Sequence, residues 1–237
     1  MDKKRILVFD SGVGGLNAFA ALNKRFLNCV FYYLSDKNGC PYGGKSVSQL
    51  LDLSLSLLKK HGADGFDGVV VACNTLSTTV LPLIKHELSP PVFGVFPPPT
   101  LKGKTLLVCT ERTADSYYVK TCCQVYDVIP AKTLAADIEE NIFSLENISL
   151  NFLPEGEYDN VALGCTHYLY LKRAFSRRYP KAVIYDGLDR LLTDFGRFAE
   201  NGVFSVTTFC PPRVTTDDNF LGDDKVRNYA VFGKYFA

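Results

Sequence analysis

The chain has 237 residues, of which 47% are hydrophobic and 22% are charged, and its formal net charge is +1. This length suits one large domain or two lobes of about 100 to 120 residues each. The small net charge gives no electrostatic reason to expect a nucleic acid or an anionic membrane surface as a partner. Only about four apolar residues precede Asp10, too few for a secretory or membrane segment, so a cytoplasmic protein is expected.

The cysteines and histidines favour free thiols and no metal site. Eight cysteines are scattered without a C-x-x-C pair, and the three histidines (His61, His86 and His167) lie far apart. A cytosolic chain of this size carries reduced thiols more often than disulfides, and zinc ligands are usually closely spaced.

The first part of the chain alternates strand and helix patterns. Strands are predicted over residues 5–12, 30–34 and 67–73 and shortly before the prolines at 97–99. Helices are predicted up to residue 25 from a glycine-rich turn at 10–16, over 46–61, and over 75–87, where Pro82 can break the helix. The proline run cannot enter a helix and stiffens the chain, so a lobe boundary is placed there.

The second part repeats this alternation. Strands are predicted over residues 105–109, 125–129, 159–165 and 182–185, and helices begin near 111 and cover 134–143, 168–175 and 189–198. We expect an α/β fold of two pseudo-symmetric lobes, each a mostly parallel sheet flanked by helices, with an active site between them. The first lobe is predicted over residues 1–97, completed by 209–237, and the second over 98–208.

One segment of the chain occurs twice. Residues 67–75 and 159–167 both begin with Asp, continue with an apolar run, and end with a cysteine beside polar residues, Cys73 and Cys165. Short continuous apolar runs suit strands that are covered on both faces, and ligands of parallel sheets bind beyond the strand ends. The repeat therefore predicts a pocket lined by one thiol from each lobe.

Two bases on opposite faces of a small substrate can remove a proton from one side of a carbon and return it on the other. This chemistry is racemisation or epimerisation without a cofactor, and it needs neutral donors that stabilise a carbanionic transition state. Such donors are available from Ser11, Asn74, Thr75 and Thr166, and Asp10 and His167 can each assist one thiol.

Four motifs, at residues 9–16, 41–46, 72–75 and 163–168, resemble those of the glutamate racemases, within the cofactor-independent aspartate/glutamate racemases. Weaker matches lie at Asp36, 94–95, 110–113 and Asp186. The resemblance implies interconversion of L- and D-glutamate without a cofactor or metal, supply of D-glutamate for bacterial peptidoglycan and so for cell-wall biogenesis and cell shape, and a homodimer. Nucleic acid and membrane partners are not expected.

The resemblance also implies a role for each site residue. Cys73 would take the α-proton from D-glutamate and Cys165 from L-glutamate, with Asp10 and His167 as the matching helpers. The substrate would be held by Asp10, Ser11, Tyr42, Gly43, Asn74, Thr75, Thr166 and His167.

Some positions depart from the family pattern. Phe96 and the prolines at 97–99 replace an acidic residue and a small one, Leu169 replaces a proline, and the chain between the two cysteines is shorter than usual. Asp137 stands where the family commonly has a Glu near the pocket of the second lobe. Two alternatives stay open: a racemase of another small acid such as aspartate, and a two-lobed amino-acid-binding protein without catalysis.

Overall fold

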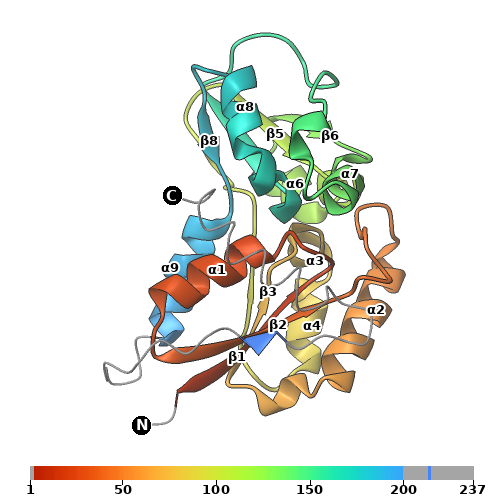
Figure 1. Ribbon diagram of the computed structural model, residues 1–237, viewed down its shortest axis with the longest axis vertical. Helices are drawn as coiled ribbons and strands as arrows, with labels where there is room; N and C mark the ends of the chain where they lie inside the picture. The colour runs from red at the N-terminus through yellow and green to blue at the C-terminus, as the bar shows by residue number, and fades with distance from the viewer. Residues whose placement is uncertain (1–2, 200–212, 215–237) are drawn as a thin grey trace.

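The computed structural model describes residues 3–199 and 213–214, which form two parallel sheets in two lobes (Figure 1). The first sheet has the order β4-β3-β1-β2-β9 and the second the order β6-β5-β7-β8. The strands are β1 (Lys4–Asp10), β2 (Cys29–Ser35), β3 (Gly68–Val71), β4 (Val92–Gly94), β5 (Thr105–Cys109), β6 (Asp127–Pro130), β7 (Asn160–Gly164), β8 (Val183–Tyr185) and β9 (Arg213–Val214). Every strand pair is parallel, so the predicted two-lobed α/β fold is confirmed.

Helices cover both faces of each sheet. They are α1 (Leu16–Arg25), α2 (Val47–Lys60), η1 (Ala63–Gly65), α3 (Asn74–Thr79), α4 (Leu81–Glu87), α5 (Glu111–Ala114), α6 (Tyr117–Cys122), α7 (Leu134–Glu140), η2 (Leu145–Asn147), η3 (Thr166–Leu171), α8 (Lys172–Arg178) and α9 (Leu188–Ala199). In β1, Leu7 and Phe9 pack with α2, α3 and α4, whereas Ile6 and Val8 pack with α1 and α9. This burial on both faces explains the continuous apolar runs.

The repeat seen in the sequence is also a repeat of hydrogen bonds. Asp67, before β3, accepts the backbone N–H of Arg5 at 2.6 Å, and Asp159, before β7, accepts that of Lys104 at 2.7 Å. Each of these pairs joins the start of a cysteine strand to the start of the strand beside it, β1 or β5. The aspartate that begins each copy of the repeat therefore fixes the register of its strand pair.

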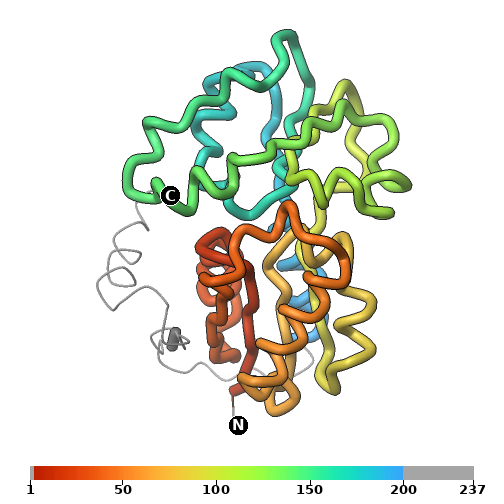
Figure 2. Tube along the Cα trace, turned by 90° about the vertical axis from the view of Figure 1, so that its right-hand side faces the viewer, coloured from red at the N-terminus to blue at the C-terminus, as the bar shows by residue number. Residues whose placement is uncertain are grey.

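Two short connections join the lobes, which lie one above the other in Figure 2. One contains the prolines at 97–99, whose carbonyls at Pro97 and Pro98 accept the hydroxyls of Tyr118 and Tyr126 at 2.8 and 3.1 Å. The other contains Gly187, where a side chain would meet the backbone of Phe96. The connections therefore run side by side, and only a residue without Cβ fits at the second.

Helix α9 returns to the first lobe after the second connection. Its residues Leu191 and Phe195 are buried in the core that contains Ile6 and Val8. Strand β9 then pairs with β2 at the edge of the first sheet. Because α9 packs in the first lobe, the second lobe ends before this helix and not at residue 208 as predicted. The boundary at 97/98 stays a prediction, and residues 209–212 and 215–237 lie outside the described part of the chain.

Two predicted helices differ from the structure. The helix over 75–87 is divided at Val80 into α3 and α4, with Pro82 in the first turn of α4, as its missing N–H permits. The helix over 168–175 is instead the 3-10 helix η3 followed by α8.

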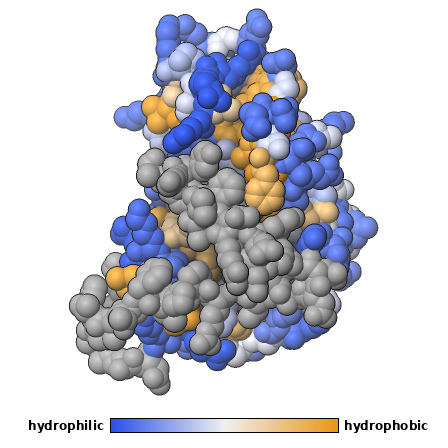
Figure 3. Space-filling view, viewed as in Figure 1, coloured by the Kyte–Doolittle hydropathy of each residue, from blue (hydrophilic) through white to orange (hydrophobic). Residues whose placement is uncertain are grey.

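Some apolar side chains lie on the surface of the molecule. Figure 3 shows apolar residues grouped among hydrophilic ones on one face of the second lobe. Within residues 3–199 and 213–214, none of the helices combines the length and the hydropathy needed to cross a bilayer.

Candidate active site

The two cysteines of the repeat occupy equivalent places in the two lobes. Cys73 follows β3 and precedes α3, and Cys165 follows β7 and precedes η3. Both have extended backbones, and only 5% and 6% of their surface is exposed. Cys165 is also among the charges that raise the pKa of Cys73, so the two thiols lie within electrostatic range of each other.

Cys73 lies among groups that keep its thiol protonated. Its Sγ is 3.9 Å from Oγ of Ser11. Burial raises the pKa of the Cys73 thiol, and the Asp10 carboxylate raises it further. Hydrogen bonds with the backbone of Leu76 and with Ser11 oppose these two effects, and positive charge that enters the site would further favour the thiolate.

His167 lies between Cys165 and a carboxylate. Its Nδ1 is 3.7 Å from Sγ of Cys165, and its Nε2 is 2.7 Å from Oε2 of Glu139. Burial alone would lower the pKa of the imidazole. Hydrogen bonds with the thiols of Cys165 and Cys40 and with Glu139 outweigh burial and raise this pKa well above its ordinary value. An imidazolium at this position stabilises negative charge on the Cys165 sulfur.

Asp10 is fully buried at the end of β1, and its two carboxylate oxygens differ in their surroundings. Its Oδ2 accepts the backbone N–H groups of Gly12 at 3.1 Å and Gly15 at 2.9 Å. Within the described part of the chain, its Oδ1 has no hydrogen-bond partner. Burial raises the pKa of Asp10, although the nearby His167 opposes this effect. A buried carboxylate oxygen without a partner is costly, and an entering cation would stabilise it.

A cluster of hydroxyls joins the lobes beside the cysteines. Oγ1 of Thr75, from the first lobe, lies 3.0 Å from Oγ1 of Thr110 and 3.4 Å from that of Thr113, both from the second lobe. All three side chains are buried. Such hydroxyls can donate to a carboxylate.

The other predicted substrate residues lie near these groups with partners of their own. Asn74 donates to the carbonyl of Val95 at 3.2 Å, and Tyr42 donates to Oδ2 of Asp36 at 2.7 Å. The carbonyl of Gly43 accepts the N–H of Arg112 at 2.9 Å. Thr166 is 2% exposed, and its Oγ1 lies 2.6 Å from the position that a Cβ atom at Gly14 would take.

Glu139 was missed in the sequence analysis, which placed Asp137 near this pocket. The Oδ2 atom of Asp137 accepts the hydroxyl of Thr133, the residue that precedes α7, at 2.8 Å. Glu139 instead accepts from both His167 and the backbone of Val13, at 2.7 and 2.9 Å. Residues two apart on a helix face different directions, and the sequence does not show which of these directions faces the other lobe.

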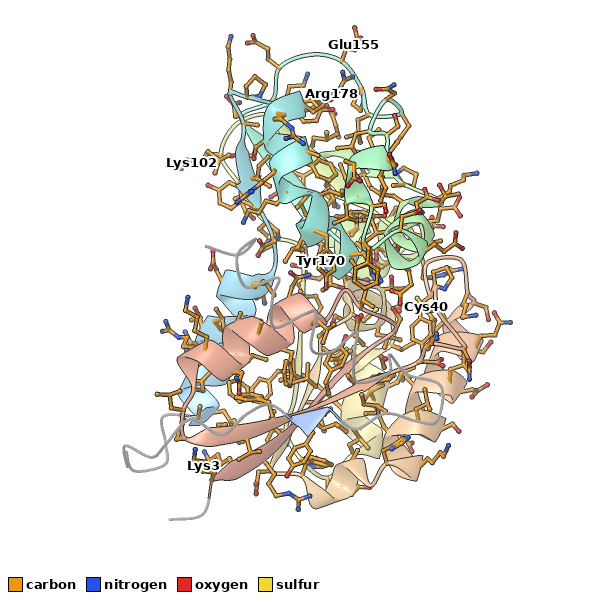
Figure 4. All side chains as sticks on the ribbon, viewed as in Figure 1. Lys3, Cys40, Lys102, Glu155, Tyr170 and Arg178 are labelled. Carbon is orange, nitrogen blue, oxygen red and sulfur yellow. The ribbon has the colours of Figure 1, made fainter. Side chains whose placement is uncertain are left out.

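Cys40 is a second residue that was not assigned to the site. Figure 4 shows it at the level where the lobes meet, in the loop that follows β2. Cys40, Glu139 and His167 each bring one metal-ligating atom within 4.8 Å of the others.

Comparisons with known proteins identify the family. No protein-family model matches the chain. It is 34% identical over 192 residues to the glutamate racemase of Vibrio campbellii, covering 72% of this chain and 70% of that protein. It is 30% identical over 199 residues to the glutamate racemase of Buchnera aphidicola subsp. Schizaphis graminum, covering 75% of this chain and 78% of that protein.

Solved structures agree with the fold. Escherichia coli glutamate racemase superimposes with a TM-score of 0.79 at 22% identity, over 97% of this chain and 94% of that one. The Thermus thermophilus glutamate racemase superimposes with a TM-score of 0.67 at 28% identity, over 91% and 86% of the two chains. From these sequence identities and their coverage, the chain belongs to the glutamate racemase family and is an amino-acid racemase, an isomerase.

Proposed function

We propose that this chain interconverts L- and D-glutamate without a cofactor, using Cys73 and Cys165 as the two bases. The matched placement of the two cysteines is the observation that carries this proposal. Each follows a central strand of its lobe, each is buried, and each has one ionisable helper, Asp10 or His167.

In one direction, the Cys73 thiolate removes the α-proton of D-glutamate while the Cys165 thiol donates its proton to the opposite face of the carbon. The products are L-glutamate, a Cys73 thiol and a Cys165 thiolate, and the reverse reaction exchanges the two roles. The raised pKa of His167 supports this assignment, because an imidazolium stabilises the Cys165 thiolate.

The substrate's own charges complete the site. Its ammonium group can pair with Oδ1 of Asp10 and so offset the negative charge that raises the pKa of Cys73. Its carboxylates can accept hydrogen bonds from the hydroxyl cluster of Thr75, Thr110 and Thr113. Donors to a carboxylate that gains negative charge in the transition state stabilise that state more than the ground state.

The test is incubation of the purified protein with L-glutamate or D-glutamate in deuterated water without pyridoxal phosphate. We expect loss of circular dichroism and entry of α-deuterium into the product enantiomer. Cys73→Ala and Cys165→Ala should each lower the rate by at least about 10²-fold, since each removes a base. Cys122→Ala, at an exposed cysteine, should leave the rate unchanged. A racemase that keeps its rate in either of the first two variants would contradict the mechanism.

Substrate choice and biological role follow from the same proposal. Glutamate should exceed aspartate in kcat/KM by about 10- to 200-fold, the usual discrimination for one methylene. Supply of D-glutamate for peptidoglycan predicts that the gene restores growth of a bacterium that requires D-glutamate. A cytoplasmic location and a homodimer stay predictions, and sedimentation analysis tests the second.

A further inference from the structure

Three side chains of different chemistry converge at the edge of the candidate active site. Cys40 comes from the loop after β2, Glu139 from α7, and His167 from η3, so both lobes contribute. Their ligand atoms all lie within 4.8 Å of one another, and this is the one group of its kind within residues 3–199 and 213–214. The Cys40 thiol is also within hydrogen-bonding reach of the His167 ring.

A thiolate, an imidazole and a carboxylate form a donor set that suits Zn²⁺. Zinc bonds of about 2.0 to 2.3 Å place tetrahedral ligand atoms roughly 3.3 to 3.7 Å apart. Only small side-chain movements are needed to reach this geometry. The distance between Nε2 of His167 and Oε2 of Glu139 must increase slightly from 2.7 Å. Any separation of the three ligand atoms that approaches 4.8 Å must decrease. Hard ions such as Mg²⁺ prefer oxygen ligands and do not fit this set.

The cluster is open to an entering ion. Cys40 is partly exposed, and the Glu139 side chain is 22% exposed, whereas His167 is buried behind them. Gly12 lies next to the cluster, and a Cβ atom at this position would contact both the Glu139 carboxylate and the Cys40 sulfur. The absence of a side chain at Gly12 therefore leaves room for the ligands to close around an ion.

We propose that Cys40, Glu139 and His167 form a binding site for Zn²⁺, and that its occupation inhibits racemisation. As the bonds form, the Cys40 thiol and the Nε2 nitrogen of His167 each lose a proton to solvent, and no electron is transferred. The bound ion replaces the Nε2 proton and takes Glu139 from its hydrogen bond with the ring, so His167 is no longer an imidazolium beside Cys165. The inhibition rests on the proposed function, but binding of the metal does not.

The experiment compares the parent protein with Cys40→Ser and Cys40→Ala, and uses Cys122→Ser as the control at an exposed cysteine. Equilibrium dialysis with Zn²⁺ measures binding, and absorption of the Co²⁺-loaded protein detects thiolate-to-metal charge transfer. The parent and Cys122→Ser should bind one ion and show this absorption. The two Cys40 variants should lose the absorption and bind Zn²⁺ at least about tenfold more weakly.

Racemisation measured over a range of Zn²⁺ concentrations gives the second readout. With each protein compared with its own rate in the absence of zinc, the half-inhibitory zinc concentration of the Cys40 variants should be at least about tenfold higher than that of the parent. Equal zinc binding and inhibition in the parent and the Cys40 variants would assign the ion to other thiols and overturn the proposal, as would a parent that binds no zinc. If the parent binds zinc through Cys40 but has no racemase activity, the metal site stands and the proposed function fails.

Discussion

Glu139 is hydrogen-bonded to His167 across the helices α7 and η3, with 2.7 Å between Oε2 and Nε2. The same oxygen accepts the backbone N–H of Val13 from the opposite lobe at 2.9 Å. One carboxylate therefore orients the imidazole beside Cys165 and fastens the glycine-rich turn of the first lobe.

Glu139→Gln should slow racemisation because it keeps a hydrogen bond to His167 but removes the charge that favours the imidazolium. We expect kcat/KM to fall about 10- to 100-fold. The fall must be equal in both directions, since the two enantiomers have the same free energy. The primary deuterium isotope effect should increase more for L-glutamate than for D-glutamate, because Cys165 is the base that we propose acts on the L enantiomer. Circular dichroism with α-deuterated substrates measures both quantities.

Asp137→Asn is the matched control on the same helix. Asp137 bonds only to Thr133 and Asn141 of its own helix turns in the described chain, so its change should leave kcat/KM within about twofold of the parent. Equal losses in the two variants would argue against a specific role of Glu139.

Gly14→Ala should displace His167 from Cys165, its proposed catalytic partner in the second lobe. A Cβ at Gly14 would lie 2.6 Å from Nδ1 of His167 and 2.7 Å from the backbone nitrogen of the same residue. Because backbone cannot yield as a flexible side chain does, the lobes must separate. We expect kcat to fall at least about 10²-fold, the cost of misplacing reacting groups by about 1 Å.

Gly44→Ala is the control for this change, since nothing lies within 4 Å of its Cβ position. It should keep the parent rate and melting temperature. A fully active Gly14→Ala protein would show that the lobes do not approach as closely in solution.

Much of the fold could be predicted from the sequence because its signals are local. The four residues of β3 are all buried, and so are the five of β7, so the apolar runs at 69–72 and 161–163 are covered on both faces. The aspartate that begins each copy of the sequence repeat makes the same hydrogen bond in each lobe, from Arg5 to Asp67 and from Lys104 to Asp159. This shared structural role explains why the aspartate recurs in the sequence.

The parts of the site that could not be predicted depend on how the lobes meet. Residues two apart on a helix differ by about 200° in direction, so a motif match could not decide between Asp137 and Glu139. The pairing of Thr75 with Thr110 likewise joins side chains from different lobes at 3.0 Å. No periodicity along the chain encodes such a contact.

Tyr42→Phe should destabilise the protein. The Tyr42 hydroxyl donates to Oδ2 of Asp36 at 2.7 Å, and the two residues are only 2% and 8% exposed. Loss of the donor leaves a buried carboxylate oxygen unpaired, which costs about 1 to 3 kcal/mol. Urea unfolding should show this decrease in the free energy of unfolding. Tyr117→Phe, at a residue that is 83% exposed, should show none, and equal stabilities of the two variants would contradict the prediction.

Cys29 should make the protein less stable in alkali. Burial raises the pKa of its thiol from 9.0 to about 11, although Lys4 opposes this effect. Between these values the unfolded chain loses a proton that the folded chain keeps. The stability that the neutral thiol contributes is therefore complete below pH 9 and is lost as the pH rises through about 11. In urea unfolding at several pH values, Cys29→Ala should flatten the decline over this interval, even if the cavity lowers stability at neutral pH. Cys122→Ala, which changes an exposed thiol, should keep the parent slope, and an unchanged slope in Cys29→Ala would refute the argument.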